Sequence, residues 1–258
     1  MMSFSYKAQH PMASVRIGRV RIGDTPRVVA TLVTPHLPNR LADARRDGAD
    51  LVELRLDYLA HWPEARVVEA VKRAARATDL PLIATARAAR EGAARRDGWI
   101  GDERRREALL KAVLPHVQAV DIELSSAIAP EIVAAARKAS CAVIVSYHHF
   151  QSTPSVSRLR GLVGQCRARG ADVVKLVTTA RAPVDMVRLL CLLHERPAHP
   201  LVAFAMGPHA LLSRLMASFF QSALLYAGLG TPDGATPAAP GQPSLRDLTA
   251  ALKQFRLR

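Results

Sequence analysis

The sequence predicts a (β/α)8 TIM barrel, an α/β fold in which eight parallel strands alternate with eight helices. Eight short apolar runs, rich in β-branched residues, alternate with stretches whose apolar residues recur at helical spacing. Strands that are buried on both faces and joined by helices form a parallel sheet, and eight repeats in about 230 residues fit a closed barrel. A doubly wound open sheet is the alternative. That fold usually carries a glycine-rich phosphate-binding turn after its first strand, and residues 34–38 contain no glycine.

The predicted elements follow one another along a single domain of residues 1–258. An N-terminal extension, residues 1–26, contains a candidate β-hairpin around Gly18 or Gly23, which we expect to close the bottom of the barrel. Strands are expected at residues 27–33, 50–57, 82–87, 119–124, 142–148, 172–177, 201–206 and 222–227. Helices are expected at residues 37–47, 63–77, 102–115, 130–139, 154–169, 182–194, 210–220 and 244–255, the last with a capping signal in residues 244–247. Residues 228–243 follow the eighth strand, where barrels carry active-site loops, and are a candidate lid.

The composition argues against several classes of protein. No apolar run among the 258 residues approaches the roughly 20 residues that a membrane span needs, and the N-terminal residues lack the apolar segment of a signal peptide. The three cysteines, Cys141, Cys166 and Cys191, fit no metal-ligand spacing and resemble small core residues in a reducing compartment. We therefore expect a cytoplasmic protein without a metal site.

The net charge of +14 comes almost wholly from arginine, since only six of the 36 basic residues are lysines. The arginines are spread along the predicted helices, Arg104 to Arg106 among them, and no aromatic residues interleave with them. A platform for single-stranded nucleic acid needs such aromatics. We therefore interpret the arginines as a solvated surface and expect no nucleic-acid partner, while part of the charge favours an anionic substrate.

Lys175 interrupts the apolar run of the sixth predicted strand. Burying an ammonium group is unfavourable and favours the neutral amine, which is a nucleophile able to form a Schiff base. Two structural interpretations stand beside this one. Lys175 pairs with a buried carboxylate, or it lies near a strand end and extends its ammonium group to water.

Other ionisable residues lie near the carboxyl ends of the predicted strands, which meet over the mouth of a barrel. Because buried charges are unfavourable unless they are paired, such a cluster indicates a functional site or a tight ionic network. A lysine beside a histidine is typical of imine chemistry, in which the histidine moves protons, and arginine binds carboxylates with two parallel hydrogen bonds. Together with Lys175 and the neighbouring Ser213, the cluster contains Glu53, Arg55, Asp57, Arg87, Asp121, Glu123, His148, His149 and Arg214.

Seven short motifs occur in order from about Arg27 to the C-terminus. They are Glu53-Leu-Arg-Leu-Asp57, Thr85-Ala-Arg87 with Glu91-Gly92, Asp121-Ile-Glu-Leu124, Ser146-Tyr-His-His-Phe150 with Thr153-Pro154, Val174-Lys175, Met206-Gly207 with Ser213-Arg214, and Ala239-Pro-Gly-Gln242. Each motif is weak alone. The ordered set resembles the type I 3-dehydroquinate dehydratase family, the Schiff-base enzymes of the shikimate and quinate pathways.

The resemblance implies a barrel enzyme, commonly a homodimer, that removes water from 3-dehydroquinate to give 3-dehydroshikimate without a metal or dissociable cofactor. It implies that Lys175 forms the imine with the C3 ketone, while His148 removes a proton from C2 and then protonates the departing C1 hydroxyl group. Glu91 is expected to orient His148 and to favour its imidazolium form. The implied substrate-binding positions are Glu53, Arg55, Arg87, Arg214, Ala238 and Gln242, with Arg214 on the substrate carboxylate.

Four positions depart from the family pattern. His149 stands where Asp or Asn is usual, and we expect it to alter the pKa of His148. Ala93 and Ala210 each replace a glycine. Ala238 replaces a lid serine that commonly meets the substrate, so we expect one hydrogen bond to be lost.

Three other functions remain as alternatives, of which nucleic-acid binding through the arginine-rich surface is one. A class I aldolase acting on a phosphorylated sugar would need a glycine-rich phosphate-binding turn after the last strands, and residues 206–208 offer a single glycine. A non-catalytic binding protein that keeps the barrel would have no need of both Lys175 and His148. The sequence does not distinguish a role in biosynthesis from one in quinate breakdown, because the chemistry is the same.

Overall fold

The computed structural model describes residues 14–33, 37–92, 102–195, 198–229 and 238–257. The strands are β1 Val15–Ile17, β2 Val20–Ile22, β3 Arg27–Leu32, β4 Leu51–Arg55, β5 Leu82–Thr85, β6 Ala119–Glu123, β7 Ala142–His149, β8 Val173–Thr179, β9 Leu201–Met206 and β10 Leu224–Gly228. The helices are α1 Leu37–Arg46, α2 Glu64–Ala77, α3 Glu103–Val113, α4 Ala129–Lys138, α5 Val156–Ala168, α6 Pro183–His194, α7 Ala210–Phe219 and α8 Leu245–Gln254. The predicted element order is confirmed, and most boundaries differ by one or two residues.

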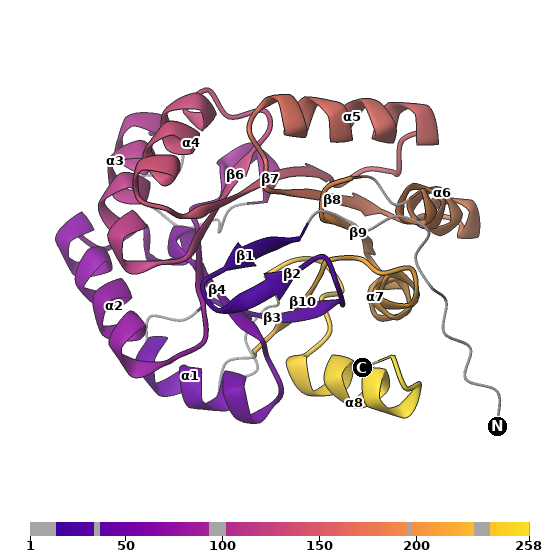
Figure 1. The fold of residues 1–258 in the computed structure, drawn as a ribbon, viewed down its shortest axis with the longest axis horizontal. Coiled ribbons are helices and arrows are strands. Elements are labelled where there is room, and N and C mark those ends of the chain that lie inside the picture. The colour runs from indigo at the N-terminus through magenta and orange to yellow at the C-terminus, as the bar shows by residue number, and fades with distance from the viewer. Residues whose placement is uncertain (1–13, 34–36, 93–101, 196–197, 230–237, 258) are drawn as a thin grey trace.

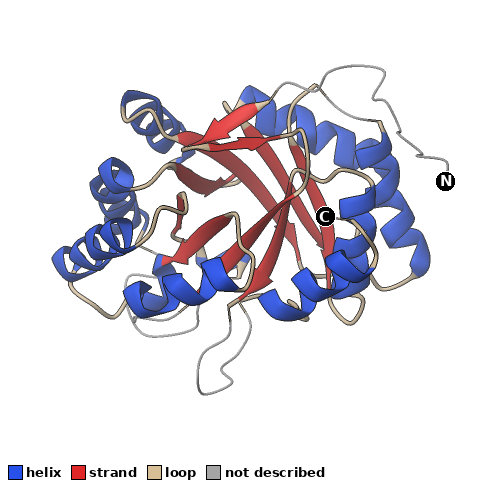
Figure 2. Ribbon diagram, turned by 60° about the horizontal axis from the view of Figure 1, so that its bottom comes forward, coloured by secondary structure: helices blue, strands red, loops and turns tan. Residues whose placement is uncertain are grey.

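Eight parallel strands form the centre of the fold in the order β10-β3-β4-β5-β6-β7-β8-β9. Figure 1 shows these strands ringed by helices, and the tilted view of Figure 2 shows the strands crossing the centre at an angle to the helices around them. The two ends of the sheet meet, because the N–H of Ala223 donates a hydrogen bond to the carbonyl of Leu201 at 2.8 Å. The predicted (β/α)8 barrel is therefore confirmed.

The hairpin of β1 and β2 covers the amino-terminal ends of the barrel strands. Its turn uses Gly18, whose positive φ of 55° suits glycine. A side chain at this position would meet Pro81 and Gln118, which directly precede β5 and β6. Ile17 and Ile22 are fully buried. The hairpin thus lies where the sequence predicts it and seals the bottom of the barrel.

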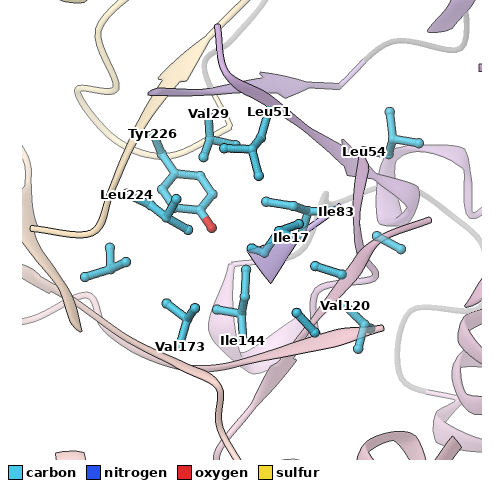
Figure 3. Packing of buried hydrophobic residues seen from close by; sticks show 14 of the residues in the cluster. Ile17, Val29, Leu51, Leu54, Ile83, Val120, Ile144, Val173, Leu224 and Tyr226 are labelled. Carbon is cyan, nitrogen blue, oxygen red and sulfur yellow. The ribbon is translucent and has the colours of Figure 1, made fainter. Parts of the chain in front are cut away.

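The barrel interior is apolar near this closed end. Figure 3 shows Val29, Leu51, Ile83 and Ile144 pointing inward around Ile17. Successive residues of a strand point to opposite faces, so the residue two positions further along also points inward. Those next positions include Thr31, Glu53, Thr85, Ser146 and, in β8, Lys175, which are all buried. The strands therefore place a polar layer directly above the apolar one.

The outer helices are anchored by capping and by apolar faces. Ser244 accepts a hydrogen bond from the N–H of Asp247 at 3.1 Å, which confirms the capping signal predicted for the last helix.

Cys141 and Cys166 are buried as expected, but Cys191 is exposed on α6, so its assignment to the core is wrong. None of the described helices is long and apolar enough to cross a membrane.

The candidate lid lies only partly within the described residues. Residues 238–243 are described and return to the barrel through a bridge between Gly228 and Ser244. Residues 230–237 lie outside the described residues.

Candidate active site

A cavity opens at the carboxyl ends of the strands. Its lining contains all nine residues to which the family resemblance gave a catalytic or substrate-binding role: Glu53, Arg55, Arg87, Glu91, His148, Lys175, Arg214, Ala238 and Gln242. They come from distant parts of the chain and meet because parallel strands deliver their carboxyl ends to one rim. The other lining residues are Thr31, Gly92, Phe150, Val177, Phe204, Met206, Tyr226 and Ala239. Five further residues of the predicted cluster do not line the cavity: Asp57, Asp121, Glu123, His149 and Ser213.

The ammonium group of Lys175 is buried between two carboxylates. Its Nζ lies 2.9 Å from Asp121 Oδ2 and 3.6 Å from Glu53 Oε1. The ring of Tyr226 covers Nζ from another side, with its centroid 3.8 Å away. With 4% of Lys175 exposed, the interpretation that it extends to water is wrong. The lysine has carboxylate partners, which offset the cost of burying its charge inside a cavity.

Arg87 is the centre of the ionic network around this lysine. Its Nη1 lies 3.0 Å from Asp121 Oδ1 and 3.1 Å from Glu123 Oε1, and it donates to Ser146 Oγ at 2.8 Å. Burial by itself raises the pKa of Asp121, but Arg87 and Lys175 outweigh burial and hold that pKa far below its usual range. Asp121 is therefore a fixed anion that balances charge and does not carry protons.

His148, near the end of β7, faces Glu91 in the short 3-10 turn Ala89–Glu91. His148 Nδ1 lies 3.1 Å from Glu91 Oε2, and the same oxygen accepts a hydrogen bond from the backbone N–H of His148 at 3.2 Å. This arrangement suits the tautomer with hydrogen on Nδ1, which leaves the lone pair of Nε2 available to the cavity.

Burial and positive charge keep the imidazole of His148 neutral. Burial, followed by the charges of Arg87 and Lys175, lowers the pKa of His148 well below 6.5. Asp121 raises this pKa, but burial and the nearby cations outweigh it. The expectation that Glu91 favours the imidazolium form stays a prediction. Burial also raises the pKa of Glu91, although a hydrogen bond from Ser125 and the charge of Arg87 oppose this. The cavity thus holds a neutral imidazole.

Two supporting residues escaped the sequence analysis. Ser125 donates a hydrogen bond to Glu91 Oε1 at 2.7 Å, which leaves Oε2 for His148. Arg106 is 1% exposed, forms an ion pair with Glu123, and donates to the carbonyl of Ala86 at 2.6 Å. Its assignment to a solvated arginine surface is wrong.

The helical spacing carried a signal for Arg106. The apolar residues Leu109, Leu110 and Val113 of α3 are buried, and Arg106 precedes them at the i, i+3, i+4, i+7 spacing of a single helix face. Ser125 follows a strand in an ordinary turn and has no comparable signal.

Arg55 and Gln242 hold residues 238–243 against the mouth of the barrel. Arg55 forms two hydrogen bonds with Asp57, at 2.8 and 2.9 Å, and its Nη1 donates to the carbonyl of Ala238 at 3.2 Å. Gln242 accepts a hydrogen bond from the N–H of Ala238 at 3.1 Å and donates to Thr31 at 3.2 Å. The backbone of Ala238 is therefore fixed although its side chain cannot form hydrogen bonds.

Arg214 differs from the other cavity arginines because it has no acidic partner among the described residues. It is 1% exposed, and its guanidinium group donates to the carbonyls of Tyr226, Ala205 and Ala210 at 2.7 to 3.3 Å. Its carbon Cζ also lies 4.2 Å from the centroid of the Phe204 ring. Burial lowers the pKa of Arg214 to about 9, so it is still a cation at neutral pH. A buried cation without a counter-ion, beside a cavity, can bind an anionic ligand.

The model of the type I 3-dehydroquinase family matches residues 28–257. The chain belongs to this family. The 3-dehydroquinate dehydratase of Thermococcus gammatolerans is 34% identical over 225 residues, which cover 87% of this chain and 97% of the relative. That of Pyrococcus abyssi is 30% identical over 226 residues, which cover 88% of this chain and 97% of the relative.

A third relative is longer than this chain. The bifunctional 3-dehydroquinate dehydratase/shikimate dehydrogenase of Arabidopsis thaliana is 36% identical over 205 residues, which are 78% of this chain and 32% of the plant protein. The chain therefore spans about a third of that relative, whereas it spans nearly the whole length of the other two.

Solved structures agree with the family assignment. The 3-dehydroquinate dehydratase of Geobacillus kaustophilus superimposes with a TM-score of 0.84 at 25% identity, covering 95% of this chain and 96% of that one. The enzyme of Enterococcus faecalis gives a TM-score of 0.76 at 28% identity and covers 93% and 99% of the two chains.

Of the four departures from the family pattern, Ala238 lines the cavity and His149 does not. His149 is on the opposite face of β7 from His148, where its ring stacks on Tyr147 with centroids 6.2 Å apart, and it does not line the cavity. No effect of His149 on the pKa of His148 is therefore evident beside those of burial, Arg87 and Lys175. Ala210 is buried under the loop, and Ala93 lies outside the described residues.

Proposed function

We propose that this protein removes water from 3-dehydroquinate to give 3-dehydroshikimate through an imine between Lys175 and the C3 ketone of the substrate. Membership of the type I 3-dehydroquinase family assigns 3-dehydroquinate dehydratase activity in the shikimate pathway. The observation that carries the mechanism is the position of Lys175, a buried primary amine that lines the same cavity as a neutral His148.

The first step needs a neutral amine. The ammonium group of Lys175 lies between Asp121 and Glu53, and Asp121 stays ionised, so it does not keep the proton. The neutral imidazole of His148 accepts this proton in our proposal. The freed lone pair of Nζ then attacks the ketone, and loss of water gives the imine. Both carboxylates remain to stabilise the positive charge of the protonated imine.

The imine makes the C2 hydrogen acidic, because the protonated nitrogen accepts the electrons that the C–H bond releases. His148 removes that proton through Nε2, which gives an enamine. The enamine electrons then expel the C1 hydroxyl group while the imidazolium of His148 protonates it, so that water departs. Glu91 stabilises the imidazolium for as long as it exists, because its Oε2 lies 3.1 Å from Nδ1. Hydrolysis of the product imine restores Lys175.

The remaining assigned residues position the substrate. Arg214, the buried cation without an acidic partner among the described residues, binds the substrate carboxylate. Glu53 and Arg87 face the hydroxyl groups from inside the barrel, while Arg55, Ala238 and Gln242 fix the loop that covers the bound molecule. Binding through a group remote from the reacting carbons supplies orientation, which lowers the barrier to the chemical step.

Borohydride trapping tests this proposal. The protein is mixed with 3-dehydroquinate and sodium borohydride, and the products are analysed by intact mass and peptide mapping. Borohydride reduces an imine to a stable secondary amine, so we expect one substrate-dependent adduct on Lys175. The exposed helix lysines serve as internal controls, and Lys175→Met is the matched variant that should form none. A folded protein that gives neither an adduct nor 3-dehydroshikimate would contradict the proposal.

The assembly and location of the protein are further proposals. We propose a homodimer of single-domain chains that needs no metal or dissociable cofactor and acts in the cytoplasm. Apolar side chains exposed on α6 and α7 support self-association, since burying them removes apolar surface from water. They are Val184, Val187, Leu211, Leu212 and Phe219. Light scattering on the purified protein tests the dimer, and a mass of one chain at micromolar concentration would contradict it.

A further inference from the structure

The hydroxyl group of Tyr226 is buried without a hydrogen-bond partner among the described residues. Tyr226 belongs to β10, is 3% exposed and lines the cavity beside Lys175. Leaving a buried hydroxyl group unpaired is unfavourable, and a phenylalanine of nearly the same shape would avoid this. The presence of an unpaired hydroxyl group inside a cavity is explained if a bound molecule forms the missing hydrogen bond.

The orientation of Tyr226 leaves its hydroxyl group free. Lys175 Nζ lies 3.8 Å from the ring centroid, over the face of the ring. The hydroxyl group is at the ring edge, so the contact with Lys175 does not use it. Figure 3 shows Tyr226 pointing from its strand toward the barrel axis. An atom bonded to Nζ would therefore lie beside this ring, and it meets the hydroxyl group when it is directed toward that edge.

Other polar side chains around Lys175 are already engaged. Thr31 and Thr85 each donate a hydrogen bond to Glu53, at 3.0 and 2.8 Å. Ser146 donates to Asp121 at 2.6 Å. The carboxylates themselves only accept hydrogen bonds when they are ionised. Of the described hydroxyl groups beside Lys175, that of Tyr226 is the one not already used as a donor within the protein.

The hydroxyl group of Tyr226 also keeps its proton. Burial, followed by the negative charges of Glu53 and Asp121, raises the pKa of Tyr226 well above 10, although Arg87 opposes this. The phenol is therefore protonated at neutral pH and available as a hydrogen-bond donor.

We propose that Tyr226 is a further catalytic residue, whose hydroxyl group donates a hydrogen bond to the ketone oxygen of the substrate while Lys175 attacks the carbonyl carbon. This inference rests on the proposed imine mechanism and adds to it a donor that stabilises the oxygen on which negative charge develops. The ligand group concerned is a carbonyl oxygen attached to the carbon that Nζ joins.

The step balances without any further reactant. His148 takes a proton from the Lys175 ammonium group, the lone pair of Nζ forms the C–N bond, and the electron pair of the C=O double bond moves to the oxygen. Tyr226 donates its hydrogen bond to this oxygen. The oxygen then receives one proton from the attacking nitrogen and the second from the imidazolium of His148. The C–O bond breaks, water leaves, and the nitrogen lone pair forms the C=N bond.

Tyr226→Phe tests the proposal because it removes the hydroxyl group and keeps the ring that covers Lys175. The rate of imine formation is measured by rapid mixing with 3-dehydroquinate, a borohydride quench at successive times and intact mass. We expect it to fall by about 100-fold, the typical effect of removing one donor to a developing oxyanion. The melting temperature should stay the same or rise, since an unpaired buried hydroxyl group is lost. Tyr147→Phe is the matched control, since Tyr147 lies outside this cavity, and we expect its trapping rate to be unchanged.

The outcomes separate this inference from the mechanism beneath it. If the unaltered protein forms no adduct, the imine proposal fails and the role of Tyr226 fails with it. If the unaltered protein forms the adduct and Tyr226→Phe forms it within about twofold of the same rate, the imine mechanism stands and the role of Tyr226 is overturned. A slow Tyr226→Phe with unchanged melting temperature supports the role, whereas a slow variant with a lowered melting temperature overturns it in favour of a structural role.

Discussion

Glu91 contacts His148 twice, through Nδ1 at 3.1 Å and through the backbone N–H at 3.2 Å, and both contacts use Oε2. Because this carboxylate contacts both the ring and the backbone N–H of His148, it fixes the ring orientation relative to β7. The lone pair of Nε2 is thereby directed to the cavity, while burial and nearby cations keep the ring neutral. Orientation and protonation state thus have separate causes in this site.

The first prediction concerns the acid side of the pH profile. Because burial, Arg87 and Lys175 lower the pKa of His148 well below 6.5, the imidazole remains a base in mildly acidic solution. We expect kcat/KM to fall with decreasing pH only well below 6.5. Initial rates over pH 4 to 9 check this, and an acid limb centred at 6.5 or above would contradict it.

The same shift affects stability. The unfolded chain binds a proton at His148 more readily than the folded one, so falling pH favours unfolding between the unfolded pKa of about 6.5 and the lower folded value. The contribution of His148 to the free energy of unfolding is therefore fully present above about pH 6.5. It is lost as the pH falls through the pKa of His148 in the folded protein. Urea unfolding of His148→Gln beside the parent protein should show a weaker loss of stability over this window.

A second prediction concerns Ser125, which donates to Glu91 Oε1 at 2.7 Å. Ser125→Ala removes a hydrogen bond that lowers the pKa of Glu91, so this pKa should rise further and the carboxylate should hold His148 less firmly. We expect kcat to fall by about 10-fold, equivalent to about 1.4 kcal/mol, and the loss of kcat that protonation of Glu91 causes to begin at higher pH than in the unaltered protein. Ser152→Ala, at an exposed position, is the control. An unchanged pH profile in Ser125→Ala would contradict a positioning role.

A third prediction concerns Arg214 and its lack of an acidic partner among the described residues. Arg214→Met removes the cation that we assign to the substrate carboxylate, so KM should rise by about 100-fold, the order expected for loss of a charged hydrogen-bonded contact. Arg188→Met, which breaks a pair with Asp185 outside the cavity, is the control. Steady-state kinetics check the effect. A normal KM in Arg214→Met would remove Arg214 from the binding site.

A fourth prediction concerns the buried ion pair of Arg106 with Glu123. Arg106→Met leaves Glu123 with fewer partners in a dry environment, so it should destabilise the fold by about 3–5 kcal/mol, the usual effect of breaking a buried pair. Arg104→Met, at an exposed position two residues away, should change stability by less than about 0.5 kcal/mol. Urea unfolding measures both. Equal stability of the two variants would show that the pair contributes nothing to the fold.

The fold could be predicted because the barrel repeats one simple pattern. Strands buried on both faces read as continuous apolar runs, and Lys175 stood out as the polar exception in such a run. The cavity residues could be predicted as a group because the carboxyl ends of parallel strands converge. Neither the fold nor the grouping of the cavity residues depends on which side chains form hydrogen bonds or ion pairs with each other.

What sequence could not supply is the pairing of charges and the protonation states. The neutral state of His148 depends on burial and on Arg87, which lies 61 residues earlier in the chain. The partners of Lys175 come from two other strands. Tyr226 was part of a weak strand pattern, and its unpaired hydroxyl group is visible only once the surrounding donors are placed.

The last prediction concerns Gly241, in the segment that Arg55 and Gln242 hold against the mouth of the barrel. Its φ is +68°, and a Cβ at this position would overlap the carbonyl oxygen of Gly207. Because that atom belongs to the backbone and the Gly207 N–H bonds to Pro240 at 3.1 Å, neither side can move without displacing the loop. Gly241→Ala should therefore destabilise the fold by about 1–3 kcal/mol and lower kcat/KM by at least about 10-fold, through loss of substrate positioning.

Gly164→Ala provides the matched control for the change at Gly241. Gly164 lies at an exposed position in the middle of α5, where an added Cβ would have no atom within 4 Å, and α5 does not line the cavity. Alanine there should stabilise the protein by about 1 kcal/mol, because it reduces the freedom of the unfolded chain, and it should leave kcat/KM unchanged. Thermal unfolding and initial rates measure both variants. Full activity in Gly241→Ala would mean that residues 238–243 do not need their observed position for the reaction.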